Sequence, residues 1–242
     1  MKKLLSALVC FLLTAPLFAT APDPSVDHRV AQWQQTIERA KESIRAGKYR
    51  KADQTLGQTI DEVCNALTGG DEASRMIGLL LTLRALAEAG QDQQTDALWS
   101  WHLAQQFEPN LARVDLSEFG SPSELLSQHR IVPTEESEGE SDESANEEAQ
   151  EVREFTPPKV SKAPVKFPRG ARWDQQAGQV MVLVTIEEDG ALSNPKILES
   201  LPNPALTLNA LEAMKATWGF KPAEVDGKPV ASYYNLQVNY IP

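Results

Sequence analysis

The chain has 242 residues, a formal net charge of −11 and a hydrophobic content of 41%. This length suggests two domains, and the hydrophobic content can supply a core for each of them. The acidic balance argues against nucleic acid and anionic membrane surfaces as general partners, because like charges repel.

The N-terminus has the pattern of a secretory signal peptide. Lys2 and Lys3 precede a mostly apolar run over residues 4–15. About 20 apolar residues are needed to span a bilayer, so this run is short for a transmembrane helix. We expect a signal peptide within residues 1–21, with cleavage after Ala19 favoured. The alternative is an uncleaved N-terminus that anchors the chain in the inner membrane.

Residues 25–130 carry apolar side chains at helical spacing and predict four helices in two hairpins, followed by a short closing helix. Gly47 ends the first helix, Gly90 ends the third, and Pro109 stops the fourth. The side chains expected to face the core are Val30, Trp33, Ile37, Ala40, Ile44, Ala52, Leu56, Ile60, Val63, Leu67, Ile77, Leu80, Leu81, Ala85, Ala97, Trp101, Ala104 and Phe107.

Small residues recur in these hairpins where helices would cross or turn. They are Ala40, Gly47, Ala52, Ala97 and Ala104, with Pro109 after the second pair. This arrangement resembles the tetratricopeptide repeat, which implies a groove that docks a peptide or a partner protein. The alternative is a helical spacer with a packed core. We expect Trp33, Trp99 and Trp101 to belong to that core rather than to a cofactor site.

Residues 131–166 differ in composition from the rest of the chain. Residues 133–154 hold ten acidic residues and one arginine, too few apolar groups to repay the entropy of ordering. Pro157, Pro158 and Pro164 favour an extended backbone in the remainder. We therefore predict a disordered linker over 131–166 that lets the flanking domains move independently.

No pattern in the sequence indicates catalysis. The three histidines, His28, His102 and His129, have no metal-ligand spacing, and Cys64 is the one cysteine left after cleavage. No nucleophile elbow, phosphate loop or dinucleotide motif is present. We predict no enzymatic activity, no cofactor and no metal. Cys64 itself is expected to be a buried core thiol, with an intermolecular disulfide as the alternative.

The last 75 residues predict strand, strand, helix, strand, and so an α+β protein overall. A β-branched run over 178–186 ends at the turn Asp189–Gly190, and a short strand would cover residues 196–198. A helix is expected over residues 206–218 and a final strand over residues 233–241.

The final strand alternates strictly. Tyr234, Leu236, Val238 and Tyr240 would face one way, and Tyr233, Asn235, Gln237 and Asn239 the other. The strand has no charged residue and no internal proline to block its edge, so an extended peptide could pair with it by β-augmentation. The alternatives are a central strand, or pairing with its own copy in a homodimer.

An ordered set of landmarks in this region resembles the TonB C-terminal domain family. The landmarks are Phe167-Pro168, Ala171, Gly178, Val180, Val182, Val184, Asp189-Gly190, Asn194-Pro195-Lys196, Ala210-Leu211, Trp218, Phe220, Pro222, Ala223 and Gly227 to Val230. They place the resemblance at residues 167–242.

The resemblance implies a function in the periplasm. In that family the last strand pairs with the TonB box of an outer-membrane receptor, and an anchored N-terminus engages an inner-membrane motor. The partner-binding residues it implies here are Val165, Lys166, Phe167, Ser232, Tyr233, Tyr234, Asn235, Leu236, Gln237, Val238, Asn239 and Tyr240.

Two functional hypotheses follow. The first is a transducer or accessory of TonB-dependent transport. Residues 1–21 lack the histidine by which conventional anchors engage the motor, so the helical repeats would dock onto the motor or onto an anchored partner. The second is an envelope adaptor outside transport, similar to TolA, that acts through its helical repeats.

Overall fold

A computed structural model describes residues 24–66, 71–131, 154–165 and 178–240. Two compact units, 1–35 and 36–242, divide the chain, and every element after the first helix belongs to the second unit. The expected signal peptide, most of the acidic linker, and Lys166 with Phe167 lie outside the described residues. Within the described residues, no helix is both long and apolar enough to cross a membrane.

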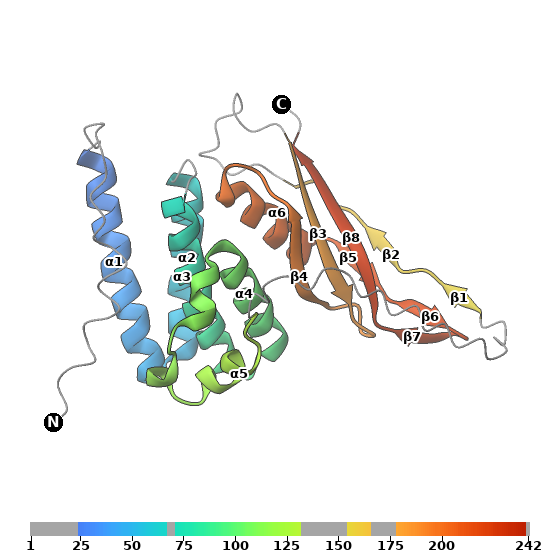
Figure 1. Cartoon of the computed structure of the whole chain (residues 1–242), viewed down its shortest axis with the longest axis horizontal. Coiled ribbons are helices and arrows are strands. Elements are labelled where there is room, and N and C mark those ends of the chain that lie inside the picture. Colours follow the sequence, from blue (N-terminus) through green and yellow to red (C-terminus); the bar gives the residue numbers. More distant parts are fainter. Residues whose placement is uncertain (1–23, 67–70, 132–153, 166–177, 241–242) are drawn as a thin grey trace. The chain divides into compact units, whose positions relative to one another are not determined.

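The N-terminal part is helical, as the sequence predicts (Figure 1). Its elements are α1 (Pro24–Arg45), α2 (Tyr49–Ala66), α3 (Asp71–Ala89), α4 (Gln94–Phe107), the 3-10 turns Pro109–Arg113 and Ser117–Phe119, and the closing helix α5 (Pro122–Gln128). The four long helices and the closing helix are confirmed. Their likeness to tetratricopeptide repeats stays a prediction.

Helix α3 is the centre of the helical domain, because it contacts α2, α4 and α5 and is buried on nearly every side. A helix that is apolar all round is expected in such a position. Trp33, Trp99 and Trp101 are each at most 4% exposed, which confirms them as core residues. Two predicted core residues differ, since Val30 and Phe107 are only half-buried.

Cys64 is half-buried rather than fully buried. Burial raises the pKa of its thiol to about 12, with smaller contributions from the carboxylates of Asp61 and Glu212. The nucleophilic thiolate is therefore scarce at neutral pH.

The C-terminal part contains a three-stranded antiparallel sheet in the order β4-β3-β8. Its strands are β3 (Gly178–Ile186), β4 (Leu192–Glu199) and β8 (Ser232–Tyr240), and helix α6 (Pro204–Thr217) lies between β4 and β8 in the chain. The predicted order of strand, strand, helix, strand is confirmed. The second strand is longer than the three residues expected.

Five short strands were not predicted. They are β1 (Phe155–Thr156), β2 (Lys159–Ser161), β5 (Gly219–Lys221), β6 (Ala223–Val225) and β7 (Lys228–Val230). They form two small sheets, β1-β6-β7 and β2-β5. A hairpin turn at Asp226 and Gly227, both with positive φ, connects β6 to β7.

The prediction of a disordered linker up to residue 166 is wrong for its last part. Strand β1 pairs with β6, and β2 pairs with β5, so residues 155–161 are held by backbone hydrogen bonds. The backbone N–H of Asp226 also donates to the carbonyl of Glu154 at 2.9 Å. Composition does not predict these strands, because their partners β5 and β6 are distant in sequence. Those partners also bind through backbone groups, which every residue type except proline supplies in full.

The turn between β3 and β4 requires glycine. Gly190 has φ +84°, and a Cβ there would lie 2.7 Å from the backbone oxygen of Phe220 in β5. The turn is closed by the N–H of Ala191, which donates to the Asp189 carboxylate at 2.8 Å. The hairpin tip thus packs against the backbone of a strand that belongs to another sheet.

We expect Gly190→Ala to lower the free energy of unfolding by about 2–4 kcal/mol, from backbone strain plus overpacking. Gly227→Ala is a matched control, because Gly227 also has positive φ (+73°) but nothing lies within 4 Å of its Cβ position. The control should lose only about 1–2 kcal/mol in urea unfolding. Equal losses in the two variants would contradict the proposed contact with Phe220.

Candidate functional site at the edges of the C-terminal sheet

Strand β8 is an edge strand. It pairs with β3 along its whole length, from Ser232 opposite Ile186 to Tyr240 opposite Gly178. No other strand in the described part of the chain pairs with β8. An edge strand presents backbone N–H and C=O groups to any incoming strand.

The two faces of β8 differ as the alternation predicts. Leu236, Val238 and Tyr240 are at most 6% exposed, whereas Tyr233 is 77% exposed. The Tyr240 hydroxyl donates to the carbonyl of Leu206, and lies 3.1 Å both from that oxygen and from Asn209 Oδ1. Burial raises the pKa of this hydroxyl, so it remains protonated. These contacts fix the end of β8 to α6.

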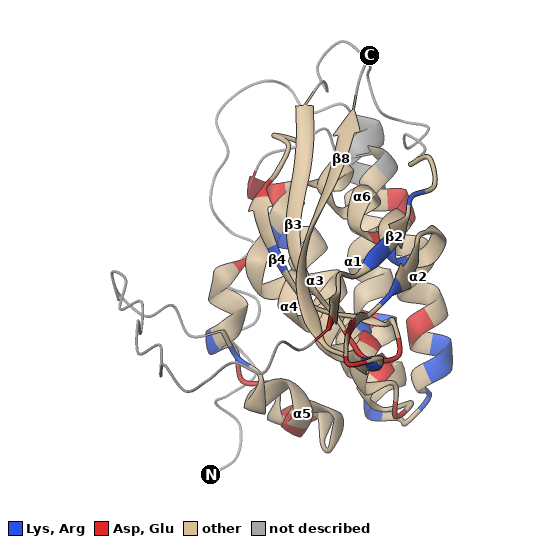
Figure 2. Ribbon diagram, turned by 90° about the vertical axis from the view of Figure 1, so that its right-hand side faces the viewer, with Lys and Arg blue, Asp and Glu red and all other residues tan. Residues whose placement is uncertain are grey.

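The outer row of β8 is polar and uncharged. The Gln237 amide donates to the side-chain oxygens of Gln179 on β3 and Asn239 on β8, at 2.8 and 2.9 Å. Neither β3 nor β8 contains a charged residue, and Figure 2 shows both strands in tan along their length. The edge therefore lacks the charges and prolines by which proteins usually block strand addition.

The other expected contact segment is only partly described. Val165 is half-buried and follows β2, which pairs with β5 and not with β8. Just before it, the carbonyl of Ala163 accepts a hydrogen bond from the Trp218 indole at 2.8 Å, and the Lys162 ammonium lies 5.4 Å from the Trp218 ring centroid. The structure thus brings residues 232–240 together along one edge and leaves Val165 beside another sheet.

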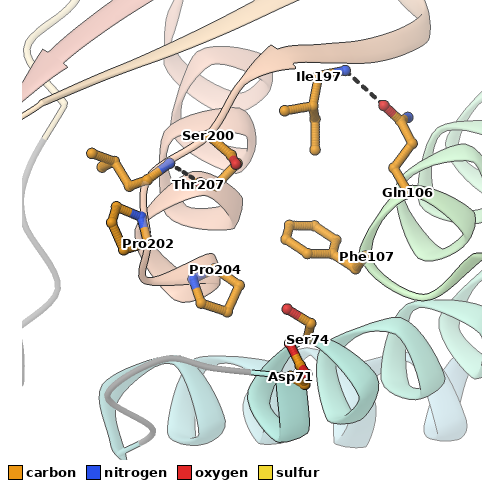
Figure 3. Close-up of a pocket in the computed structure, with 10 residues that line it drawn as sticks. Asp71, Ser74, Gln106, Phe107, Ile197, Ser200, Pro202, Pro204 and Thr207 are labelled. Carbon is orange, nitrogen blue, oxygen red and sulfur yellow. Dashed lines mark hydrogen bonds between the residues drawn. The ribbon is translucent and has the colours of Figure 1, made fainter.

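The opposite edge of the same sheet, β4, is covered by the helical domain. The Gln106 amide on α4 donates to the carbonyl of Pro195 at 2.6 Å, and its oxygen accepts the N–H of Ile197 at 2.6 Å (Figure 3). Sequence analysis missed Gln106, since glutamine is common on exposed helix faces and nothing near it marks a contact. Gln106 and Phe107 also line a cleft of about 520 Å³ between α3, α4 and the connection from β4 to α6.

Charged side chains hold α6 against the helical domain. The Arg84 guanidinium on α3 lies 3.6 Å from Asp53, 3.1 Å from Glu88 and 3.5 Å from Glu212 of α6. Close by, Lys215 of α6 pairs with Asp96 at 2.6 Å, and its ammonium lies 5.0 Å from the Trp99 ring centroid. The expectation of independently moving domains is therefore wrong for the structure described.

Within the described residues, no group of three or more His, Cys, Asp or Glu side chains could hold a metal ion. Among the histidines, burial lowers the pKa of His102, with a smaller effect from His129.

Residues 163–242 match the family model described as "Gram-negative bacterial TonB protein C-terminal". The chain carries a TonB C-terminal domain. No curated protein and no solved structure matched the chain. TonB C-terminal domains are non-enzymatic and transport-associated, belong to proteins of the cell envelope, and typically interact with outer-membrane receptors.

The carboxyl group of Glu88 should make stability depend on pH. It is 4% exposed, and burial raises its pKa from 4.5 to about 7 although Arg84 opposes the shift. The folded state therefore binds the proton on Glu88 more tightly than the unfolded state does. The free energy of unfolding of the protein should fall as the pH rises from 4.5 to 7, because Glu88 must then give up this proton. Glu88→Gln should gain up to about 3 kcal/mol relative to the wild type across this range.

Urea unfolding of both proteins between pH 4.5 and pH 8 measures this difference. Glu124→Gln is the control, because it makes the same replacement at an exposed position. A flat difference for Glu88→Gln would show that Glu88 is not buried as described.

Proposed function

We propose that this protein acts in the periplasm, where its TonB C-terminal domain binds outer-membrane receptors by β-strand addition, as a transducer or accessory of TonB-dependent transport. The observation that carries the proposal is the difference between the two sheet edges. Strand β8 is long, uncharged and has no strand partner on its outer side among the described residues, whereas the helical domain covers β4.

In the proposed complex, backbone hydrogen bonds between β8 and the receptor peptide supply affinity. The outer row, Tyr233, Asn235, Gln237 and Asn239, supplies register through its side chains. The side chain of Tyr240 fixes the end of β8 through its hydroxyl, and its backbone belongs to the strand that pairs with the peptide. Val165, Lys166 and Phe167 form a proposed second contact near the start of the domain.

Part of the helical surface is already used by contacts within the chain, which limits where another protein could bind the helices. Faces of α2, α3 and α4 contact α6 or β4 of the same chain. An inner-membrane motor or anchored partner would therefore have to use other faces of the helices, or displace the C-terminal domain. This internal use of the helices weakens the alternative of an envelope adaptor that acts through its repeats.

An NMR titration of the full chain with TonB-box peptides from receptors of the same cell tests the proposal. The full chain is needed because β1 and the contacts of α4 hold the domain. We expect shifts along residues 232–240, and Gln237→Ala, which keeps the backbone, should retain them. Tyr233→Ala should lower the affinity for the peptide several-fold, because it removes a side chain that is 77% exposed.

Two N-methylated peptides make the test specific for strand pairing. A strand pairs with one neighbour through alternate residues, so N-methyl groups on odd residues and on even residues should affect binding differently. We expect one peptide to lose at least about tenfold in affinity and the other to bind normally, equivalent to about 1.4 kcal/mol or more. Equal effects, or no shifts on β8 with millimolar peptide, would contradict strand addition.

A further inference from the structure

Two adjacent glutamines at the end of α4 each bind backbone outside their own helix in the same way. Gln106 joins the carbonyl of Pro195 and the N–H of Ile197, both at 2.6 Å. Gln105 joins the carbonyl of His129 at 3.3 Å and the N–H of Ile131 at 2.6 Å. In each case one side-chain amide bonds to the backbone on both sides of a single residue.

This geometry is the one a neighbouring strand would provide. In a parallel ladder, one residue donates to the carbonyl before the opposite residue and accepts from the N–H after it. The carboxamide of Gln106 makes these two bonds around Lys196, at the centre of β4. Figure 3 shows the bond to Ile197. The side chain of Gln106 therefore occupies the backbone carbonyl and N–H groups to which an added strand would bind.

A second feature of β4 acts in the same direction. Pro195 lies within the strand and has no N–H, and prolines are found on strands where the missing donor would face away from the ladder. Strand β8 contains no proline, and no glutamine of α4 reaches it. Ion pairs from Arg84 of α3 to Glu212 of α6, and from Asp96 of α4 to Lys215 of α6, also join the helical domain to the C-terminal part.

We propose that Gln106 closes the β4 edge and so restricts strand addition, by peptides or by other copies of this chain, to β8. The peptide part of this statement rests on the proposed function, whereas the edge closure does not. If both edges of the sheet were open, β4 of one copy could pair with β8 of the next. Such heterologous contacts can repeat and build an open-ended assembly. With the β4 edge closed, two copies can pair only through β8 of each, and this contact is complete in a dimer.

The test uses the full chain with Gln106→Met, and with Gln105→Met as a matched control on the same helix turn. Methionine keeps the length and helix propensity of glutamine but removes the amide. Hydrogen exchange should show the Ile197 amide exchanging at least about tenfold faster in Gln106→Met, with the Val182 amide of β3 unchanged. Gln105→Met should accelerate Ile131 and leave Ile197 as in the wild type.

Sedimentation at increasing protein concentration gives the second readout. The wild type and Gln105→Met should remain at or below the mass of a dimer, and Gln106→Met should form larger species. Unchanged Ile197 exchange, or unchanged association of Gln106→Met, would overturn the proposal. Neither readout uses a receptor peptide, so failure of peptide binding to β8 would count against the proposed function alone.

Discussion

The backbone groups at the two edges of the β4-β3-β8 sheet set the main constraint on this structure. Each edge offers N–H and C=O groups that need partners and that recruit other strands when exposed. At β4, Pro195 and the amide of Gln106 meet this need from within the chain. At β8 no described strand does so, and this is the edge to which we propose that a partner adds.

The helical domain therefore has a structural task inside the chain. It covers β4, and its Arg84 and Asp96 pair with Glu212 and Lys215 of α6. The two elements that directly follow β3 are therefore held from one side. The helices from residue 36 onward and the C-terminal sheet accordingly belong to one compact unit.

Sequence reasoning could predict the elements with local signatures. The helices follow from apolar spacing, β3 and β8 from alternation, and the turn at Gly190 from an Asp-Gly pair. The uncharged composition of β8 and the family resemblance favour an open edge, but a central strand or pairing with its own copy remains possible on the sequence alone. Three features could not be predicted, because each depends on backbone or side-chain partners distant in sequence. They are the pairing of β1 and β2, the ion pairs of Arg84 and the hydrogen bonds of Gln106 to β4.

We propose that a receptor peptide adds to β8 and to no other edge of the sheet. An isotope-filtered NOE experiment on the labelled full chain with an unlabelled TonB-box peptide measures where the peptide lies. Strand addition at β8 predicts cross-strand NOEs from peptide α-protons and amides to residues 232–240, and none to β4. NOEs to β4, or to the cleft beside Phe107 in place of β8, would contradict it.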